Sequence, residues 1–261
     1  KIISGNKWRK LKYNFQKAKA EGYNTVLSFG GVYSNHLHAL SYAAHQYELY
    51  SIGVVRGGAS KNTPTLDFCV NQNMKLEFLS RNLYRIDKYS KTRIDDLMKK
   101  FGSFYMIPEG GNNLLGVRGC EEIIEEINHS FDYVCCAVGT GCTAAGLIRS
   151  MHKKQQFIGF CPFKKVDEQR NNILNYCPSQ LYKNWELISD NHFGGFAKVN
   201  SNLLKFVRQF NLEYKIQLDL VYMGKLFYSL FNLIENDFFS QKTQILVLHT
   251  GGNQGLEGFN F

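Results

Sequence analysis

Glycine-marked segments of the chain hold the side chains whose types and spacing could do chemistry. In VGTGCTAAG, residues 138–146, Gly139 and Gly141 let backbone amides approach an anion, and Thr140 and Thr143 add hydroxyl donors where a helix begins. The segment predicts a cup for a monophosphate. It lacks the GK[ST] ending of a P-loop, and its GxGxxxxG spacing departs from the dinucleotide fingerprint. An ordinary glycine turn before a helix is the alternative.

Three further segments end in polar side chains that a ligand could use. In GGVYSNH, residues 30–36, local sequence favours a helix cap by Ser34 or Asn35, and the alternative is a set of donors for a carboxylate. In HTGGNQG, Thr250 offers a hydroxyl to a ring or a carbonyl at the end of a strand, unless this is a plain glycine turn. In VYMGK, Tyr222 either packs or carries a proton.

Lys7 adds a primary amine to this set. It follows a Gly-Asn turn signal in SGNKWRKL, where two more cations, Arg9 and Lys10, stand close by. Composition alone favours a solvated surface lysine. However, an amine, a monophosphate cup and a hydroxyl that can meet a ring nitrogen are together what pyridoxal phosphate requires. The combination therefore predicts that cofactor.

Strand and helix patterns alternate along the chain, which predicts an α/β fold with parallel sheets wrapped by helices. Ligands bind beyond the carboxyl ends of the strands in such sheets, where these segments lie. We expect strands at residues 25–29, 50–55, 75–79, 104–107, 133–138, 157–161 and 245–249, and helices at 10–21, 35–46, 65–72, 92–101, 114–128, 143–153, 203–210 and 225–236.

The PEGGNN segment is the best internal boundary. It predicts a smaller α/β domain, residues 9–107, and a larger one made of residues 1–8 and 108–261. The polar stretch from the 157–161 strand to about Asn200 is expected to be irregular. Within it, HFGG is interpreted as a structural turn, with closure over the site as the alternative.

Composition restricts the function classes. No run of about 18 apolar residues predicts a membrane span, and no secretory signal is visible. Seven scattered cysteines without a CxxC pair indicate reduced thiols in a cytosolic protein, and neither a disulfide framework nor a metal site. The net charge of +9 makes nucleic-acid binding a possibility to consider. However, lysine and arginine are dispersed among acidic residues, so we expect a solvated basic surface.

The order of these motifs resembles one family. SGNKWRKL is similar to the GGNKxRKL segment of the pyridoxal-phosphate enzymes of the 1-aminocyclopropane-1-carboxylate deaminase and D-cysteine desulfhydrase family, and the later motifs follow in the family's order: GGVYSNH, PEGGNN, VGTGCTAAG, VYMGK and HTGGNQG. The resemblance implies the tryptophan-synthase-β-like fold, fold type II, with two three-layer α/β domains and a homodimer. Family members carry one more segment before GGNK, and because the sequence starts without Met we expect its natural amino terminus to be missing.

The resemblance also implies roles for individual residues. The family's Schiff-base lysine falls on Lys7, and its active-site tyrosine falls on Tyr222. The phosphate loop falls on Gly139, Thr140, Gly141, Cys142 and Thr143, with Cys142 where Gly or Ser is more usual. The partner of the ring nitrogen in the desulfhydrases falls on Thr250. The residues that contact the substrate carboxylate and the cofactor's phenolic oxygen fall on Ser34 and Asn35, and His36 matches the desulfhydrase-like SNH variant.

Two positions bear on the substrate. Deaminases that open cyclopropane rings carry Glu directly after the tyrosine, where this chain has Met223, and an apolar residue where it has Thr250. Both differences argue against ring opening, and Met223 also differs from the Thr that is common in desulfhydrases. The predicted reaction is β-elimination from a small amino acid, with D-cysteine giving pyruvate, ammonia and sulfide. A 1-aminocyclopropane-1-carboxylate deaminase is the first alternative, and a protein that binds the cofactor without turnover is the second.

Overall fold

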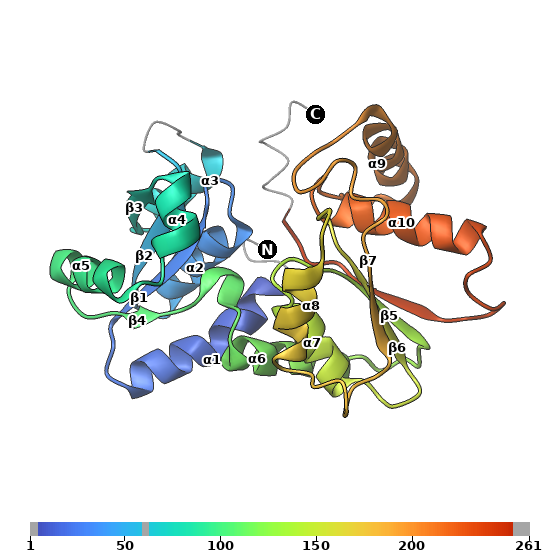
Figure 1. The fold of residues 1–261 in the computed structure, drawn as a ribbon, viewed down its shortest axis with the longest axis horizontal. Helices are drawn as coiled ribbons and strands as arrows, with labels where there is room; N and C mark the ends of the chain where they lie inside the picture. Colours follow the sequence, from blue (N-terminus) through green and yellow to red (C-terminus); the bar gives the residue numbers. More distant parts are fainter. Residues whose placement is uncertain (1–4, 59–62, 253–261) are drawn as a thin grey trace. The chain divides into compact units, whose positions relative to one another are not determined.

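The computed structural model describes residues 5–58 and 63–252 of the 261-residue chain (Figure 1). These residues form two compact units, one that extends to Gly116 and one that begins at Val117. This division differs from the predicted one of 9–107 against 1–8 and 108–261. The difference at the amino terminus arises because Lys7 already begins a helix and Trp8 packs against the core of unit 1.

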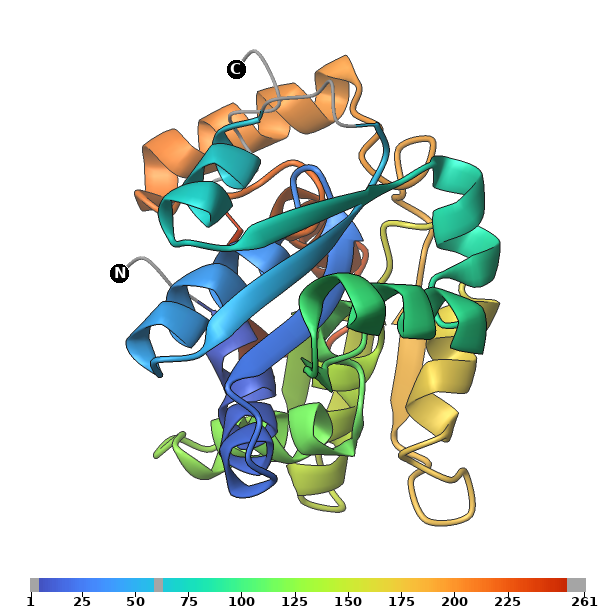
Figure 2. The same ribbon diagram turned by 90° about the vertical axis from the view of Figure 1, so that its left-hand side faces the viewer.

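Unit 1 is built on four parallel strands in the order β3-β2-β1-β4. The strands are β1 (Thr25–Gly31), β2 (Tyr50–Arg56), β3 (Lys75–Leu79) and β4 (Tyr105–Met106). The helices are α1 (Lys7–Ala20), α2 (Asn35–Gln46), α3 (Pro64–Asn71), α4 (Arg81–Asp87), α5 (Lys91–Phe101) and the short 3₁₀ helix η1 (Glu109–Gly111). Figure 2 shows β1, β2 and β3, coloured from blue to teal, side by side.

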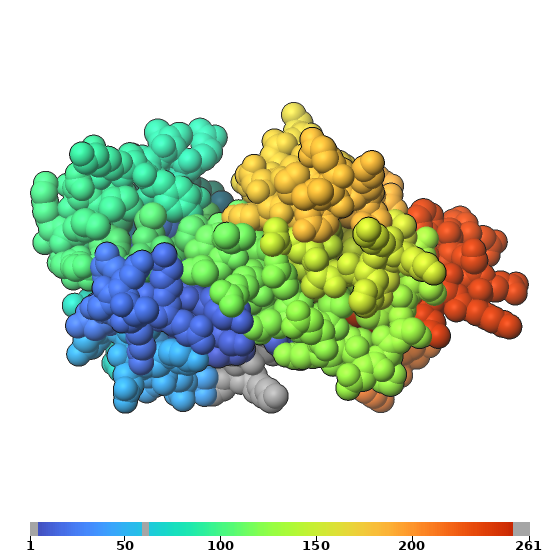
Figure 3. All heavy atoms as spheres, turned by 90° about the horizontal axis from the view of Figure 1, so that it is seen from below, coloured from blue at the N-terminus to red at the C-terminus, as the bar shows by residue number. Residues whose placement is uncertain are grey.

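Helices cover both faces of this sheet. Side chains alternate between the faces of a strand, and on β1 Val26 joins the cluster formed with α1, α2 and α3, whereas Leu27 and Phe29 join the cluster formed with α4 and α5. The central strands are therefore buried on both sides, as the apolar runs predict. The outer side chains of α1 face solvent, and this helix (blue) forms part of the surface in Figure 3.

Unit 2 repeats the arrangement with four parallel strands in the order β7-β6-β5-β8. The strands are β5 (Tyr133–Ala137), β6 (Gln156–Phe160), β7 (Trp185–Ile188) and β8 (Ile245–Leu248). Its helices are α7 (Cys142–Ser150), α8 (Asp167–Leu174), α9 (Ser201–Tyr214) and α10 (Met223–Glu235), and α6 (Leu114–Glu125) leads into it. The two parallel sheets confirm the predicted fold class.

The prediction of an irregular stretch up to about Asn200 is wrong, because α8 and β7 lie within it. Helix α8 has only eight residues, and β7 has four without a fully buried position, so neither gives a clear periodic pattern. Helix α4 is also absent from the predicted elements, whereas the other strands and α-helices correspond to predicted ones. The helix 35–46 and the strand 75–79 have the predicted bounds.

All seven cysteines are buried and free of disulfides. Within the described part of the chain, His, Cys, Asp and Glu side chains form no group of three or more that could hold a metal ion. No helix among the described residues is both long and apolar enough to cross a membrane.

Candidate active site

Lys7 is the first residue of α1 in unit 1. Its side chain is half-buried, and its Nζ donates to Oδ1 of Asn6 at 2.7 Å. The first turn of α1 holds three cations, Lys7, Arg9 and Lys10, and no acidic residue. The positive end of the helix dipole disfavours cations there. The three cations therefore lower the stability of the helix start at the candidate amine. Such local conflicts are expected at functional sites.

The PEGGNN segment holds this end of α1 in place. Lys10 Nζ donates to the carbonyl oxygen of Gly110 at 3.1 Å. Asn14 and Asn113 exchange amide hydrogen bonds at 2.7 and 3.2 Å. Gly111 has φ +65°, and a Cβ on it would lie 3.0 Å from Lys10 Cβ, so only glycine fits. The segment that predicts a domain boundary also positions the helix of the candidate amine.

Ser34 caps helix α2, as its local sequence predicts. Its Oγ accepts from the backbone N–H of Leu37 at 3.2 Å. A Cβ on Gly30 would lie 2.4 Å from that Oγ, which explains the glycine at the end of β1. A capping hydroxyl still has its own proton to donate. Ser34 and the half-buried Asn35 therefore lie at a helix N-terminus that favours a carboxylate.

His36 is buried beneath this helix start, with 4% of its surface exposed. The Ser28 hydroxyl donates to the carbonyl oxygen of Ile107 at 2.7 Å. His36 Nε2 lies 2.8 Å from Ser28 Oγ and is therefore the donor in that contact. This assigns the proton to Nε2 and leaves Nδ1 as an acceptor that has no partner among the described residues. A substrate contact by His36 stays a prediction.

The imidazole of His36 is held neutral. Burial lowers its pKa to about 3, and the positive charges of Lys10 and Lys7 act in the same direction. The starts of α1 and α2 thus lie close enough for their polar groups to interact, and the two helices pack together. Unit 1 therefore brings together Lys7, Ser34, Asn35 and His36.

The phosphate cup predicted from VGTGCTAAG lies between β5 and α7 in unit 2. Gly141 is the N-cap of α7 with φ +88°, and no side chain caps the helix. A Cβ there would lie 3.2 Å from the carbonyl oxygen of Gln169. The buried hydroxyl of Thr140 has no hydrogen-bond partner among the described residues. An uncapped helix N-terminus beside an unsatisfied hydroxyl is suited to an anion.

Tyr222 lies against this cup. A Cβ on Gly139 would be 3.4 Å from Tyr222 Oη, so a side chain there would press on the tyrosine ring. The buried carboxylate of Asp219 sets the backbone around Tyr222. It accepts the N–H groups of Val221 and Tyr222 at 2.8 Å each, and that of Met223 at 3.0 Å. Burial raises the pKa of Asp219 although these three hydrogen bonds lower it.

Thr250 follows β8 and is buried next to Met223. Its backbone N–H and its hydroxyl lie 3.4 and 3.5 Å from the sulfur of Met223. His249 ties the same loop down, because its Nε2 contacts the carbonyl oxygen of Gln217 at 3.0 Å and its Nδ1 accepts from Gly251 N–H at 3.2 Å. Within unit 2, Gly139 of the cup therefore lies next to Tyr222, and Thr250 lies next to Met223.

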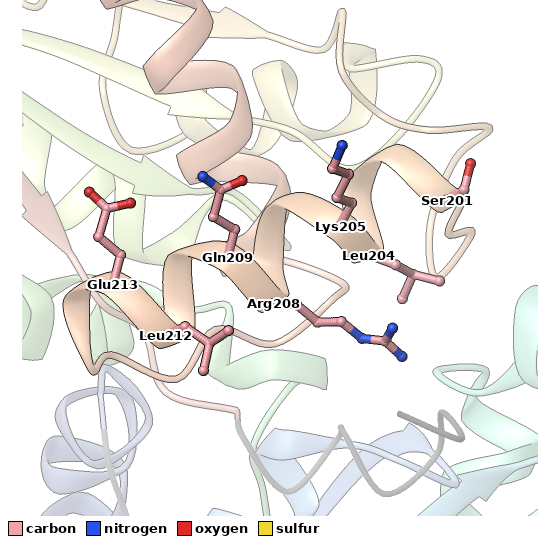
Figure 4. A pocket seen from close by; sticks show the side chains of 7 residues that line it. All are labelled: Ser201, Leu204, Lys205, Arg208, Gln209, Leu212 and Glu213. Carbon is pink, nitrogen blue, oxygen red and sulfur yellow. The ribbon is translucent and has the colours of Figure 1, made fainter.

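Sequence reasoning missed Asp219, His249 and the PEGGNN contacts. Asp219 lies four residues before the start of α10, outside the N-cap position at which an Asp signals a helix start, so the local pattern did not point to it. The contact of His249 with Gln217 joins residues far apart in the sequence and gives no local signal. A hollow on the outer side of α9 is unrelated to the site, since only α9 side chains line it, among them Leu204, Arg208 and Leu212 (Figure 4).

The chain is similar to known proteins in sequence and in structure. The sequence model of the family described as pyridoxal-phosphate-dependent enzyme matches residues 3–175. A Pyrococcus horikoshii protein with the provisional name 1-aminocyclopropane-1-carboxylate deaminase is 29% identical over 97% of this chain and 81% of its own length. The bifunctional D-cysteine desulfhydrase/1-aminocyclopropane-1-carboxylate deaminase, mitochondrial, of Arabidopsis thaliana is 29% identical over 97% and 70%. The crystal structure of an ACC deaminase homologue superposes with a TM-score of 0.83 at 27% identity, over 97% of this chain and 81% of the other.

Proposed function

Because the chain belongs to the pyridoxal-phosphate-dependent enzymes, with fold type II, we propose that it catalyses β-elimination from a small amino acid, as a D-cysteine desulfhydrase does. The observation that carries this choice is the surroundings of Thr250. Its hydroxyl has the thioether of Met223 as neighbour, and Met223 is fully buried. A neutral pair at this position fits a threonine that meets the ring nitrogen, and supplies no carboxylate for ring opening.

The residues present fit the cofactor. Its phosphate is matched by the amides and hydroxyls of Gly139–Thr143, where the Thr140 hydroxyl lacks a partner among the described residues. Cys142 is buried in the first turn of α7, so its change from the more usual residue leaves the backbone cup intact. Lys7 would hold the aldehyde, and Thr250 would meet the ring nitrogen.

The chain's own groups then divide the work. When bound, pyridoxal phosphate stabilises negative charge at the substrate α-carbon. The Lys7 amine takes the α-proton, while the hydroxyl of Ser34 and the amide of Asn35 bind the carboxylate. The carbon–sulfur bond breaks and sulfide leaves with the bonding electrons. Addition of one water then balances the reaction, D-cysteine plus water giving pyruvate, ammonia and hydrogen sulfide. Tyr222 orients the reacting groups or moves a proton.

Product analysis tests the proposal. The loaded protein is offered D-cysteine, L-cysteine and 1-aminocyclopropane-1-carboxylate separately, and pyruvate, sulfide and 2-oxobutyrate are measured. We expect pyruvate and sulfide in equal amounts from D-cysteine and no 2-oxobutyrate from the cyclopropane. Formation of 2-oxobutyrate with D-cysteine inert would instead favour the deaminase, the activity named in the relatives above. Silence with all three substrates would favour a cofactor-binding protein without turnover.

A further inference from the structure

A buried lysine holds the HFGG turn of unit 2. Lys225, in the first turn of α10, has only 3% of its surface exposed. Its Nζ donates to the carbonyl oxygen of His192 at 2.9 Å and to that of Gly195 at 2.8 Å. Two of the three ammonium protons are thus donated to one turn that lies 30 to 33 residues earlier in the chain.

The turn adopts a backbone that needs such support. Phe193, Gly194, Gly195 and Ala197 have φ of +53°, +91°, +117° and +56°. Left-handed conformations of non-glycine residues are unfavourable and persist only where the surroundings fix them. Within the turn itself, Gly195 N–H donates to the carbonyl oxygen of His192 at 3.0 Å. The lysine adds two hydrogen bonds that join this turn to α10, next to the edge-to-face contact of the Phe193 ring with Tyr228 of the same helix at 4.9 Å.

The turn delivers an aromatic side chain to the candidate site. Phe196 directly follows it, and its ring meets that of Tyr222 edge to face, with centroids 5.8 Å apart. Phe196 also stacks on Phe163, with the ring centroids 5.3 Å apart. Aromatic contacts of this kind prefer defined geometries. Because Tyr222 also lies against Gly139, a displaced Phe196 would remove one ring contact that positions the tyrosine beside the phosphate cup.

The charge of Lys225 is costly where it lies. Burial lowers the pKa of Lys225 to about 8, and the negative charge of Asp219 opposes the shift. An apolar side chain of similar length would avoid this cost of burying an ammonium. The ammonium group of Lys225 is therefore better explained by its hydrogen bonds to the turn than by a contribution to packing.

We propose that Lys225 is a positioning residue, which clamps the turn 192–195 and so keeps the Phe196 ring against Tyr222. The proposal rests on the proposed function only for the role of Tyr222. The HFGG motif is then a turn that holds Phe196 in place. This role differs from the alternative of a turn that closes over the site. Lys225→Met keeps most of the side-chain length and removes the donors, whereas Lys225→Arg keeps donors.

Hydrogen exchange and cofactor affinity test the clamp in the loaded protein without requiring turnover. We expect Lys225→Met to raise the exchange rate of the amides of Gly195 and Lys198 at least tenfold, since both donate within the turn. The dissociation constant of pyridoxal phosphate should rise about fivefold. Lys225→Arg should restore both values to within twofold of the parent, and Lys154→Met, at an exposed lysine, should change neither.

A second variant separates the effect of the Lys225 hydrogen bonds on the turn from the effect of the Phe196 ring on Tyr222. Phe196→Leu should weaken cofactor binding as Lys225→Met does, but leave the exchange of the turn unchanged. Unchanged exchange in Lys225→Met would overturn the clamp, and faster exchange with unaltered cofactor affinity would overturn its link to Tyr222. Hydrogen exchange and cofactor affinity can both be measured even if D-cysteine is not a substrate. Failure of the proposed function can therefore be distinguished from failure of this proposal.

Discussion

The hydroxyl of Thr250 lies 3.5 Å from the thioether sulfur of Met223, and both side chains are buried. Thr250 follows a strand and Met223 begins a helix, so the contact joins two segments that each carry a candidate site residue. A thioether is a weak acceptor. Met223 therefore orients the hydroxyl, but the hydroxyl can readily exchange this weak contact for a hydrogen bond with a stronger acceptor, such as the ring nitrogen of the cofactor.

Met223→Leu is expected to test this orientation. Leucine has a similar volume, so the free energy of unfolding should change by less than about 1.5 kcal/mol, but the acceptor is lost. We expect turnover of D-cysteine to fall by less than about tenfold, because a weak hydrogen bond is involved. Thr250→Val, which removes the hydroxyl itself, should cost more than Met223→Leu in steady-state kinetics. An equal or smaller loss in Thr250→Val would contradict the role of the hydroxyl.

Lys7→Ala should remove covalent attachment of the cofactor. Without the amine, the absorption band of the lysine-bound cofactor is expected to disappear, and keto-acid release should fall to background. Lys17→Ala is the matched control on the same helix, because the Lys17 ammonium forms an exposed ion pair with Glu21 at 3.2 Å. The band should be unaltered in this control. Persistence of the band in Lys7→Ala would assign the attachment to another lysine.

The phosphate cup makes a prediction about two unsatisfied hydroxyls. Thr140 and Thr65 both have a buried hydroxyl with no partner among the described residues, but only Thr140 lies in the cup. Thr140→Val and Thr65→Val should both leave the unloaded protein at least as stable as the parent, because no hydrogen bond is lost. Hydrogen bonds to a charged acceptor contribute about 1.5–3 kcal/mol. Titration with pyridoxal phosphate should therefore show at least tenfold weaker binding in Thr140→Val alone, and equal affinities would remove Thr140 from the cup.

The sequence predicts those parts of the molecule that depend on local pattern. Helix α2 has the predicted bounds because Ser34 supplies a cap and apolar residues recur at helical spacing. The glycine at 141 is predicted as part of a turn into α7, and its positive φ gives the reason. Helix α4 was missed, although it places Lys88 within 2.5 Å of Glu109 and so ties down the PEGGNN segment.

Long-range contacts lie beyond the reach of such patterns. Lys225 reads as an ordinary residue at the start of a helix, and only the fold brings it to His192 and Gly195. His36 reads as a polar residue near a ligand, whereas the fold buries it against Ser28. Both cases depend on which segments meet in space, and the periodicity of one segment carries no information about that.

The burial of His36 predicts a pH dependence of stability with a defined sign. The pKa is about 3 in the folded protein and 6.5 ordinarily, so between these values the unfolded chain binds a proton that the folded chain does not. The contribution of this group to the free energy of unfolding is fully present above pH 6.5. It falls as the pH drops below 6.5, by about 1.4 kcal/mol per pH unit.

Chemical unfolding at pH 7 and pH 5 of the parent and His36→Gln measures this effect. Glutamine can donate to Ser28 as Nε2 does, but it does not titrate, so the variant should lose about 2 kcal/mol less than the parent over this interval. His45→Gln is the control, because His45 is an exposed histidine at the other end of the same helix. It should follow the parent at both pH values. Parallel losses in the parent and in His36→Gln would show that His36 takes up its proton without unfolding, and would contradict the neutral, buried imidazole.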